Sequence, residues 1–221
     1  MRAEGRPDYL REAPQVRPAV ADAVMRAAGP SDSAVIATLL DLSQRGFLEL
    51  RASKRRVTSI FGAVDRETPE FVVDVSRWQE FDPLEQSLVS LLFTTMKRSA
   101  TMSLEDLKVL LRSRHMTYVA GIAAWRAQVI ARAVADGYLK DAGRKRTAAG
   151  EELRFSCNAF KSYIADFGRL EDDELAGLSV WGPYLVWGAL FGLADQVLRT
   201  MQLKAAGERD DLALALQTLL K

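Results

Sequence analysis

The sequence has few of the residues that build metal centres, nucleophilic sites or disulfides. Its 221 residues include one cysteine, Cys157, and one histidine, His115. A single cysteine excludes an intramolecular disulfide and is typical of a reducing compartment. A zinc site needs several Cys or His ligands, and these two residues lie far apart in sequence. We therefore expect no metal, no cofactor and no bound small molecule.

The short motifs that mark common active sites are also missing. The chain has no GxxxxGK phosphate loop, no GxSxG nucleophile elbow and no HExxH zinc helix. The acidic residues 171–174 are expected to form a solvated loop, because consecutive carboxylates point in different directions. Cys157 lies in a predicted helix and is expected to pack as a small apolar side chain. The sequence thus predicts a protein that is not an enzyme.

Charge and hydropathy give little drive toward nucleic acid or a membrane. Basic residues number 30 and acidic residues 29, for a net charge of +1. The longest apolar run, residues 178–194, is interrupted by Gly182-Pro183, and a spanning helix needs about 20 apolar residues. We interpret this run as a buried helix. Its GxxxG pair, Gly188 and Gly192, predicts close helix packing, with a dimer contact as the alternative.

A short phrase occurs twice and organises the chain. Residues 44–48 read Gln-Arg-Gly-Phe-Leu and residues 135–139 read Ala-Asp-Gly-Tyr-Leu, each after a long amphipathic helix pattern. The glycine predicts a helix that ends in a left-handed residue and turns directly into a strand. Winged-helix domains pass from their third helix into the wing in this way. We therefore predict a mainly α fold with small β wings: two tandem winged-helix modules plus a helical C-terminal tail.

This repeat sets the predicted domain boundaries. In the first module we expect strands at 47–51 and 70–75 around a loop of about twenty residues, a long loop by ordinary standards. The second module begins at Asp82-Pro83, where Glu85 completes a capping-box pattern. The predicted parts are an extended spacer (1–17), a first winged-helix-like module (18–80), a second module (81–143) and a helical tail (144–221) that packs on the second module or on another protomer.

Winged helices often place their third helix in the major groove of DNA. Candidate contacts with nucleic acid or a partner are Lys54, Arg55 and Arg56 in the predicted wing loop, and Arg126 and Arg132 in the predicted recognition helix. The two predicted recognition helices carry few basic residues, whereas a duplex binder neutralises several phosphates. Binding of a protein partner, or self-association, is therefore our first interpretation.

Three stretches resemble a bacterial family of predicted membrane proteins known as domain of unknown function 2207. Residues 35–48 resemble the family's helix that ends in Leu-Asp-Leu, followed by Arg-Gly-aromatic-Leu. Residues 146–153 with 160–164, and residues 184–195, resemble its tail. The resemblance implies a soluble cytoplasmic portion of a membrane protein whose membrane helix precedes residue 1. It supplies no catalytic residues.

Members of that family typically carry a hydrophobic hairpin before the tail. Here the sequence between Tyr138 and Thr147 is only Leu-Lys-Asp-Ala-Gly-Arg-Lys-Arg. Either this homologue lacks the hairpin or the hairpin has been removed between residues 139 and 147, where Arg144 to Arg146 would suit a positive-inside flank. The sequence therefore predicts a non-catalytic cytoplasmic interaction region of a membrane-anchored protein. The alternative is a membrane-tethered winged-helix DNA-binding regulator.

Overall fold

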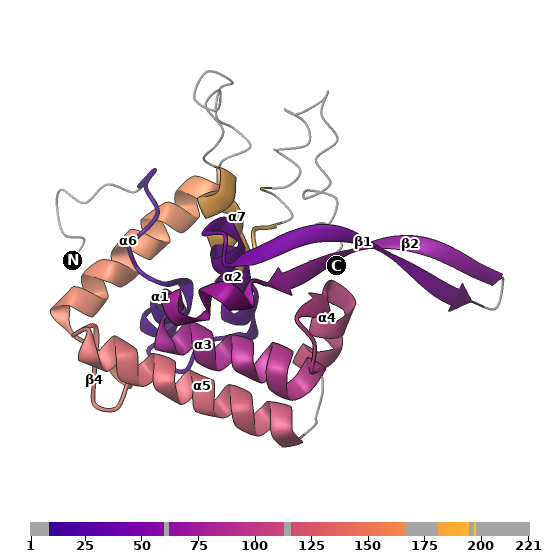
Figure 1. Cartoon of the computed structure of the whole chain (residues 1–221). Helices are drawn as coiled ribbons and strands as arrows, with labels where there is room; N and C mark the ends of the chain where they lie inside the picture. The colour runs from indigo at the N-terminus through magenta and orange to yellow at the C-terminus, as the bar shows by residue number, and fades with distance from the viewer. Residues whose placement is uncertain (1–8, 60–61, 113–115, 167–180, 195–196, 198–221) are drawn as a thin grey trace. The chain divides into compact units, whose positions relative to one another are not determined.

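The computed structural model describes residues 9–59, 62–112, 116–166, 181–194 and 197 (Figure 1). The chain is mainly helical with small antiparallel sheets, which confirms the coarse fold prediction. The described residues divide into two compact units, those within 1–41 and 126–200 and those within 42–125. The predicted module boundaries at 80 and 143 remain a prediction.

The unit of residues 1–41 and 126–200 is built from helices. α1 (Pro18–Arg26) packs against α6 (Ala148–Ala165) and α7 (Trp181–Phe191). β4 (Leu139–Lys140) and β5 (Lys145–Arg146) form a two-stranded hairpin in the segment where the family hairpin is expected. Buried apolar side chains of several helices form the core of this unit, among them Val24, Val35, Leu39, Cys157, Phe160, Ile164 and Leu185.

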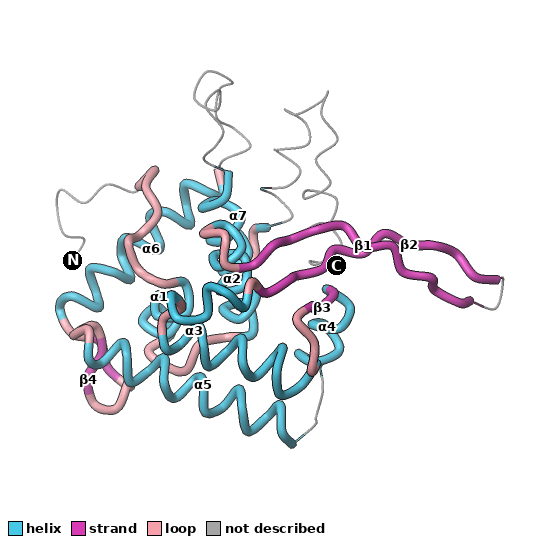
Figure 2. Tube along the Cα trace, viewed as in Figure 1, coloured by secondary structure: helices cyan, strands magenta, loops and turns pink. Residues whose placement is uncertain are grey.

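The unit of residues 42–125 is organised around a three-stranded antiparallel sheet (Figure 2). β1 (Leu48–Ser59) pairs with β2 (Gly62–Val73), and β3 (Thr101–Ser103) pairs with the base of β2. α4 (Leu104–Arg112) contacts both β2 and β3. The other helical elements are a 3₁₀ helix, η1 (Val75–Glu80), then α3 (Pro83–Val89) continuing into a π-helical segment, η2 (Ser90–Lys97). The core includes Phe71, Leu88, Leu92, Met102, Leu107 and Trp125.

Two helices, α2 (Asp32–Gln44) and α5 (Met116–Ala135), are each shared by the two units. Each precedes one copy of the repeated phrase. In both copies the glycine N–H donates a hydrogen bond to the carbonyl three residues earlier, at 3.0 Å. The next N–H donates to the carbonyl five residues earlier, at 2.9 Å. Gly46 and Gly137 have φ of 73° and 77°, so the predicted left-handed helix ends are confirmed.

The β1–β2 hairpin is longer than the sequence predicts. Each strand has 12 residues, so the predicted loop between residues 51 and 70 is wrong. Lys54, Arg55 and Arg56 consequently lie within β1. Alternation of apolar and polar residues marks a strand with one buried face. At the base of this hairpin Leu48, Phe71 and Val73 are buried, and the sequence farther along it lacks that alternation.

The second repeated phrase is closely covered by the start of α6. The Thr147 hydroxyl accepts a hydrogen bond from the N–H of Gly150 at 3.1 Å and donates to the carbonyl of Gly137 at 2.6 Å. Gly150 faces the Tyr138 carbonyl so closely that an added Cβ would lie 2.0 Å from its oxygen. This contact with backbone explains why a glycine occupies a helical position.

We predict that Gly150→Ala destabilises the fold, although alanine is the better helix former by about 1 kcal/mol. The added methyl group must displace the Tyr138 backbone, and overpacking of this kind costs about 1–3 kcal/mol. Urea unfolding followed by circular dichroism measures the change. Ser162→Ala, at an exposed site of the same helix, is the control and should leave stability nearly unchanged. Equal stability of both variants would contradict the close approach.

Candidate functional site

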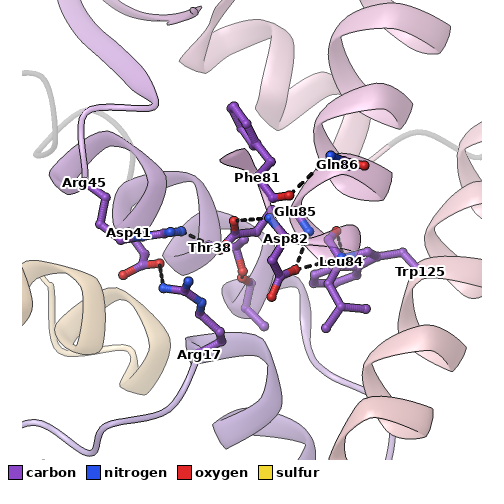
Figure 3. Close-up of polar contacts among 11 residues, drawn as sticks. Arg17, Thr38, Asp41, Arg45, Phe81, Asp82, Leu84, Glu85, Gln86 and Trp125 are labelled. Carbon is purple, nitrogen blue, oxygen red and sulfur yellow. Dashed lines mark hydrogen bonds and ion pairs between the residues drawn. The ribbon is translucent and has the colours of Figure 1, made fainter. Parts of the chain in front are cut away.

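The first family-like motif is held by an ion pair whose carboxylate is buried (Figure 3). The Arg45 guanidinium donates a hydrogen bond to Oε1 of Glu85, which is only 3% exposed. Oε2 of Glu85 accepts the N–H of Asp82 at 3.0 Å, and Asp82 in turn caps the first turn of α3 at 2.8 Å. The predicted capping box is therefore present. Its glutamate also ties the end of α2 to the start of α3.

The aromatic residue of the same motif lies between two guanidinium groups. Arg45 and Arg77 lie 4.9 Å and 4.2 Å from the centroid of the Phe47 ring. Arg77 also donates to the carbonyl of Gly46 at 2.8 Å. Phe47 packs on Phe81 at 4.8 Å between ring centroids. Each residue of the Arg-Gly-Phe phrase therefore has a structural contact.

The tail motifs are also used inside the fold. Arg146 donates to the carbonyls of Val24 and Met25, both at 2.6 Å, and so caps the last turn of α1. Phe160 of α6 packs against Tyr184 and Trp187 of α7, with ring centroids 5.8 Å and 5.9 Å away. Arg146, the last residue of the positive run 144–146, therefore has a structural role.

Two of the basic residues proposed as nucleic-acid contacts form ion pairs within the chain. Arg126 forms an ion pair with Asp32 at 2.6 Å, and Arg132 forms one with Asp136 at 2.9 Å. Lys54 and Arg56 occupy β1 positions directly opposite Glu67 and Asp65, whereas Arg55 lies opposite Arg66. The Arg126–Asp32 and Arg132–Asp136 pairs reduce the charge that the predicted recognition helix offers to phosphate.

The two glycines of the GxxxG pair have different roles. Gly188 is buried, and an added Cβ would lie 3.1 Å from Val197, so this glycine permits internal packing. Gly192 is exposed, has φ of 72° and ends α7. Nothing lies within 4 Å of a Cβ added to Gly192. Gly188 thus lies within α7 and Gly192 lies just beyond its end, so the two glycines do not form one face of this helix.

The thiol of Cys157 is fully buried. Burial, followed by the negative charge of Asp22, raises its pKa to about 12. It is thus a neutral thiol at physiological pH and packs as an apolar group. Across the described residues no group of three or more His, Cys, Asp and Glu side chains is arranged to hold a metal ion. His115 and residues 171–174 lie outside the described part of the chain.

The surface that the sequence did not indicate lies on α5. Its buried face includes Ile122 and Trp125, the latter donating its indole N–H to the Leu84 carbonyl at 3.1 Å. On the opposite side Met116 is 79% exposed and Val119 46%. Apolar residues of α5 thus occupy both buried and exposed positions. The sequence of α5 is rich in alanine and apolar on several faces, which indicates that more than one side of this helix makes contacts.

The chain matches the profile of a known protein family. A family profile described as predicted membrane protein (DUF2207), C-terminal domain, matches residues 6–148 and 138–201. The chain belongs to this family. No curated protein and no solved structure matches it. The recognition from three sequence stretches is thereby confirmed, for a DUF2207 family whose function is unknown.

The family-like phrases of this DUF2207 domain thus supply hydrogen bonds and aromatic packing inside the fold. In the part of the chain that the structure describes, no helix is both long and apolar enough to cross a membrane. Among the described residues, the exposed apolar face of α5 is a surface to which these contacts give no internal role.

We predict that Arg45→Ala lowers the free energy of unfolding by about 3 kcal/mol or more, because it leaves the Glu85 carboxylate buried without its cation. Arg154→Ala is the matched control. Arg154 pairs with Glu151 at 2.7 Å, and both side chains are more than 40% exposed, so this variant should unfold almost as the wild type does. Chemical denaturation of both variants checks the difference. Similar small losses would show that the Arg45 pair is not buried.

We also predict that Cys157 reacts with a disulfide reagent at pH 8 only after unfolding, because its pKa is raised to about 12. The neutral thiol is favoured in the folded state. Stability should therefore fall as the pH rises above the ordinary thiol pKa, where the unfolded chain ionises first. Cys157→Ala should lack this alkaline decrease. Rapid labelling of the native chain would contradict the burial.

Proposed function

We propose that this chain is the non-catalytic, cytoplasmic interaction region of a membrane-anchored protein, and that it binds a protein partner through α5. The observation that supports this proposal most directly is the exposed apolar face at the start of α5. Met116, Val119, Ala120 and Ala123 are all exposed and follow the i, i+3, i+4, i+7 spacing of one helix face. A helix that presents such residues is a usual partner for an apolar groove.

If the protein bound DNA as winged helices do, α5 would be the helix that enters the major groove. Along α5 the exposed positions are mostly alanine, valine and methionine, and the two arginines pair with acidic residues of this chain. Phosphate and base contacts need basic and amide side chains in that place. The composition of the exposed face therefore favours a protein partner over duplex DNA.

We further propose that residues 18–80 and 81–143 are winged-helix-like modules adapted to protein interaction. The two helix–glycine–strand junctions support this, since both copies use the same hydrogen bonds. The order helix, strand, helix, helix and hairpin from α3 to β5 supports it for the second copy. Fold alone does not fix function, so the proposal depends on the α5 surface.

We predict that a photo-crosslinking amino acid at Met116 or Val119, in the full-length membrane protein in cells, gives one discrete protein adduct. Ala120→Asp should abolish the adduct while leaving the thermal unfolding midpoint close to that of the wild type, because position 120 is exposed. The control is the same amino acid at Glu152, an exposed site on α6.

Two outcomes would contradict the proposal. The first is an adduct that forms equally at position 152, which would indicate non-specific contact. The second is salt-sensitive binding of mixed-sequence duplex DNA that Ala120→Asp removes, which would assign the face to nucleic acid.

A further inference from the structure

We propose that the partner of α5 is a second copy of this chain, and that the two α5 helices pair antiparallel. The inference rests on the proposed function, because it names the partner of the same helix. The surface that pairs is called the outer face here. Its exposed apolar residues are Met116, Val119, Ala120, Ala123, Ala124, Ala127, Ala131 and Val134.

The outer face runs the whole length of α5. Because α5 is one continuous helix, the relative positions of its residues follow from helix geometry. The outer face occupies about 140° of the helix surface and extends about 27 Å from Met116 to Val134. The exposed polar residues of the helix fall beside it, on one flank: Thr117, Gln128 and Arg132.

The other side of α5 is apolar as well. Its buried residues, opposite the outer face, are Tyr118, Ile122, Trp125, Val129 and Ala133. A helix that is apolar on its inner and outer sides is normally buried on both. The outer face therefore indicates that a second apolar surface packs against α5.

The spacing of the outer face suits another helix. Met116, Ala120, Ala123 and Ala127 follow steps of four, three and four residues, and Val134 comes seven residues later. This repeat keeps one side of a helix against a neighbouring helix. The central side chains are alanines, so the two helix axes can approach to about 8 Å, the short end of the usual range.

The outer face is self-complementary when the helix is reversed. A two-fold axis level with Trp125 brings together positions that lie equally far on either side of it. The facing pairs are Ala123 with Ala127, Val119 with Ala131 and Met116 with Val134. Small residues thus meet at the centre, and farther out a large residue meets a small one, which fills the space without a clash. A symmetric dimer needs this property, whereas a different partner protein does not.

Charge also permits two copies to meet. Arg126 is the charged residue of α5 closest to the axis, and it would repel its own copy if its charge were unbalanced. Asp32 of the same chain pairs with it at 2.6 Å. The antiparallel orientation also places the positive N-terminal end of each helix beside the negative C-terminal end of the other.

The first test is sedimentation equilibrium of the 221-residue chain, for which we expect a dimer. Ala127→Asp places two charges at the centre of the pair and should lower the association constant roughly 30-fold or more, as loss of a central interface residue does. Ser162→Asp adds the same charge at an exposed site of α6 and should leave association unchanged. A monomeric wild type, or equal loss from both variants, would overturn the proposal.

Disulfide trapping tests the orientation without relying on a destabilised variant. Met116→Cys and Val134→Cys chains should form an intermolecular disulfide when they are mixed, and neither should do so alone. Equal positions at the ends of an antiparallel pair lie about 27 Å apart, whereas a disulfide needs Cα atoms within about 7 Å. The native Cys157 is buried and serves as the unreactive background. A disulfide in the Met116→Cys chain alone would overturn the antiparallel pair.

The mass of the photo-adduct in cells separates this inference from the proposed function. An adduct of twice the mass of the full-length protein supports both. A monomeric chain together with an adduct to a different protein would overturn the self-pairing and leave the proposed function standing. A monomeric chain without any adduct would overturn both.

Discussion

The buried carboxylate of Glu85 is the constraint on which the unit of residues 42–125 depends. Its two oxygens accept from the Arg45 guanidinium at the end of α2 and from the backbone at the start of α3. A carboxylate removed from water is costly unless such partners are fixed in place. The pair therefore positions the chain on both sides of the β1–β2 hairpin. It also explains why an arginine precedes the glycine of the family-like phrase.

Local features were predictable and tertiary ones were not. The left-handed Gly46 and Gly137 follow from residue type and the capping box at Asp82 from spacing, and all three are present. The ion pair of Arg45 and Glu85 joins residues 40 apart in the sequence, so no local sequence pattern predicts it. The strands beyond residue 51 do not follow from the sequence, because that stretch shows no regular apolar period.

These contacts leave the functional candidates outside the motifs. The Arg-Gly-Phe phrase, Arg146 and the aromatic residues of α6 and α7 are all occupied by packing or hydrogen bonds. Residues that make a family recognisable need not be those that bind its ligand. We therefore propose the exposed apolar face of α5 as the surface for a protein partner.

The most direct test of this account is a double-mutant cycle between Arg45 and Glu85. Arg45→Met, Glu85→Gln and the double variant are compared with the wild type by urea unfolding. If the motif arginine is a structural element, the coupling energy should exceed about 1.5 kcal/mol, as for groups in one buried network. Losses that add to within about 0.5 kcal/mol would contradict it. Arg45 would then be available for a ligand.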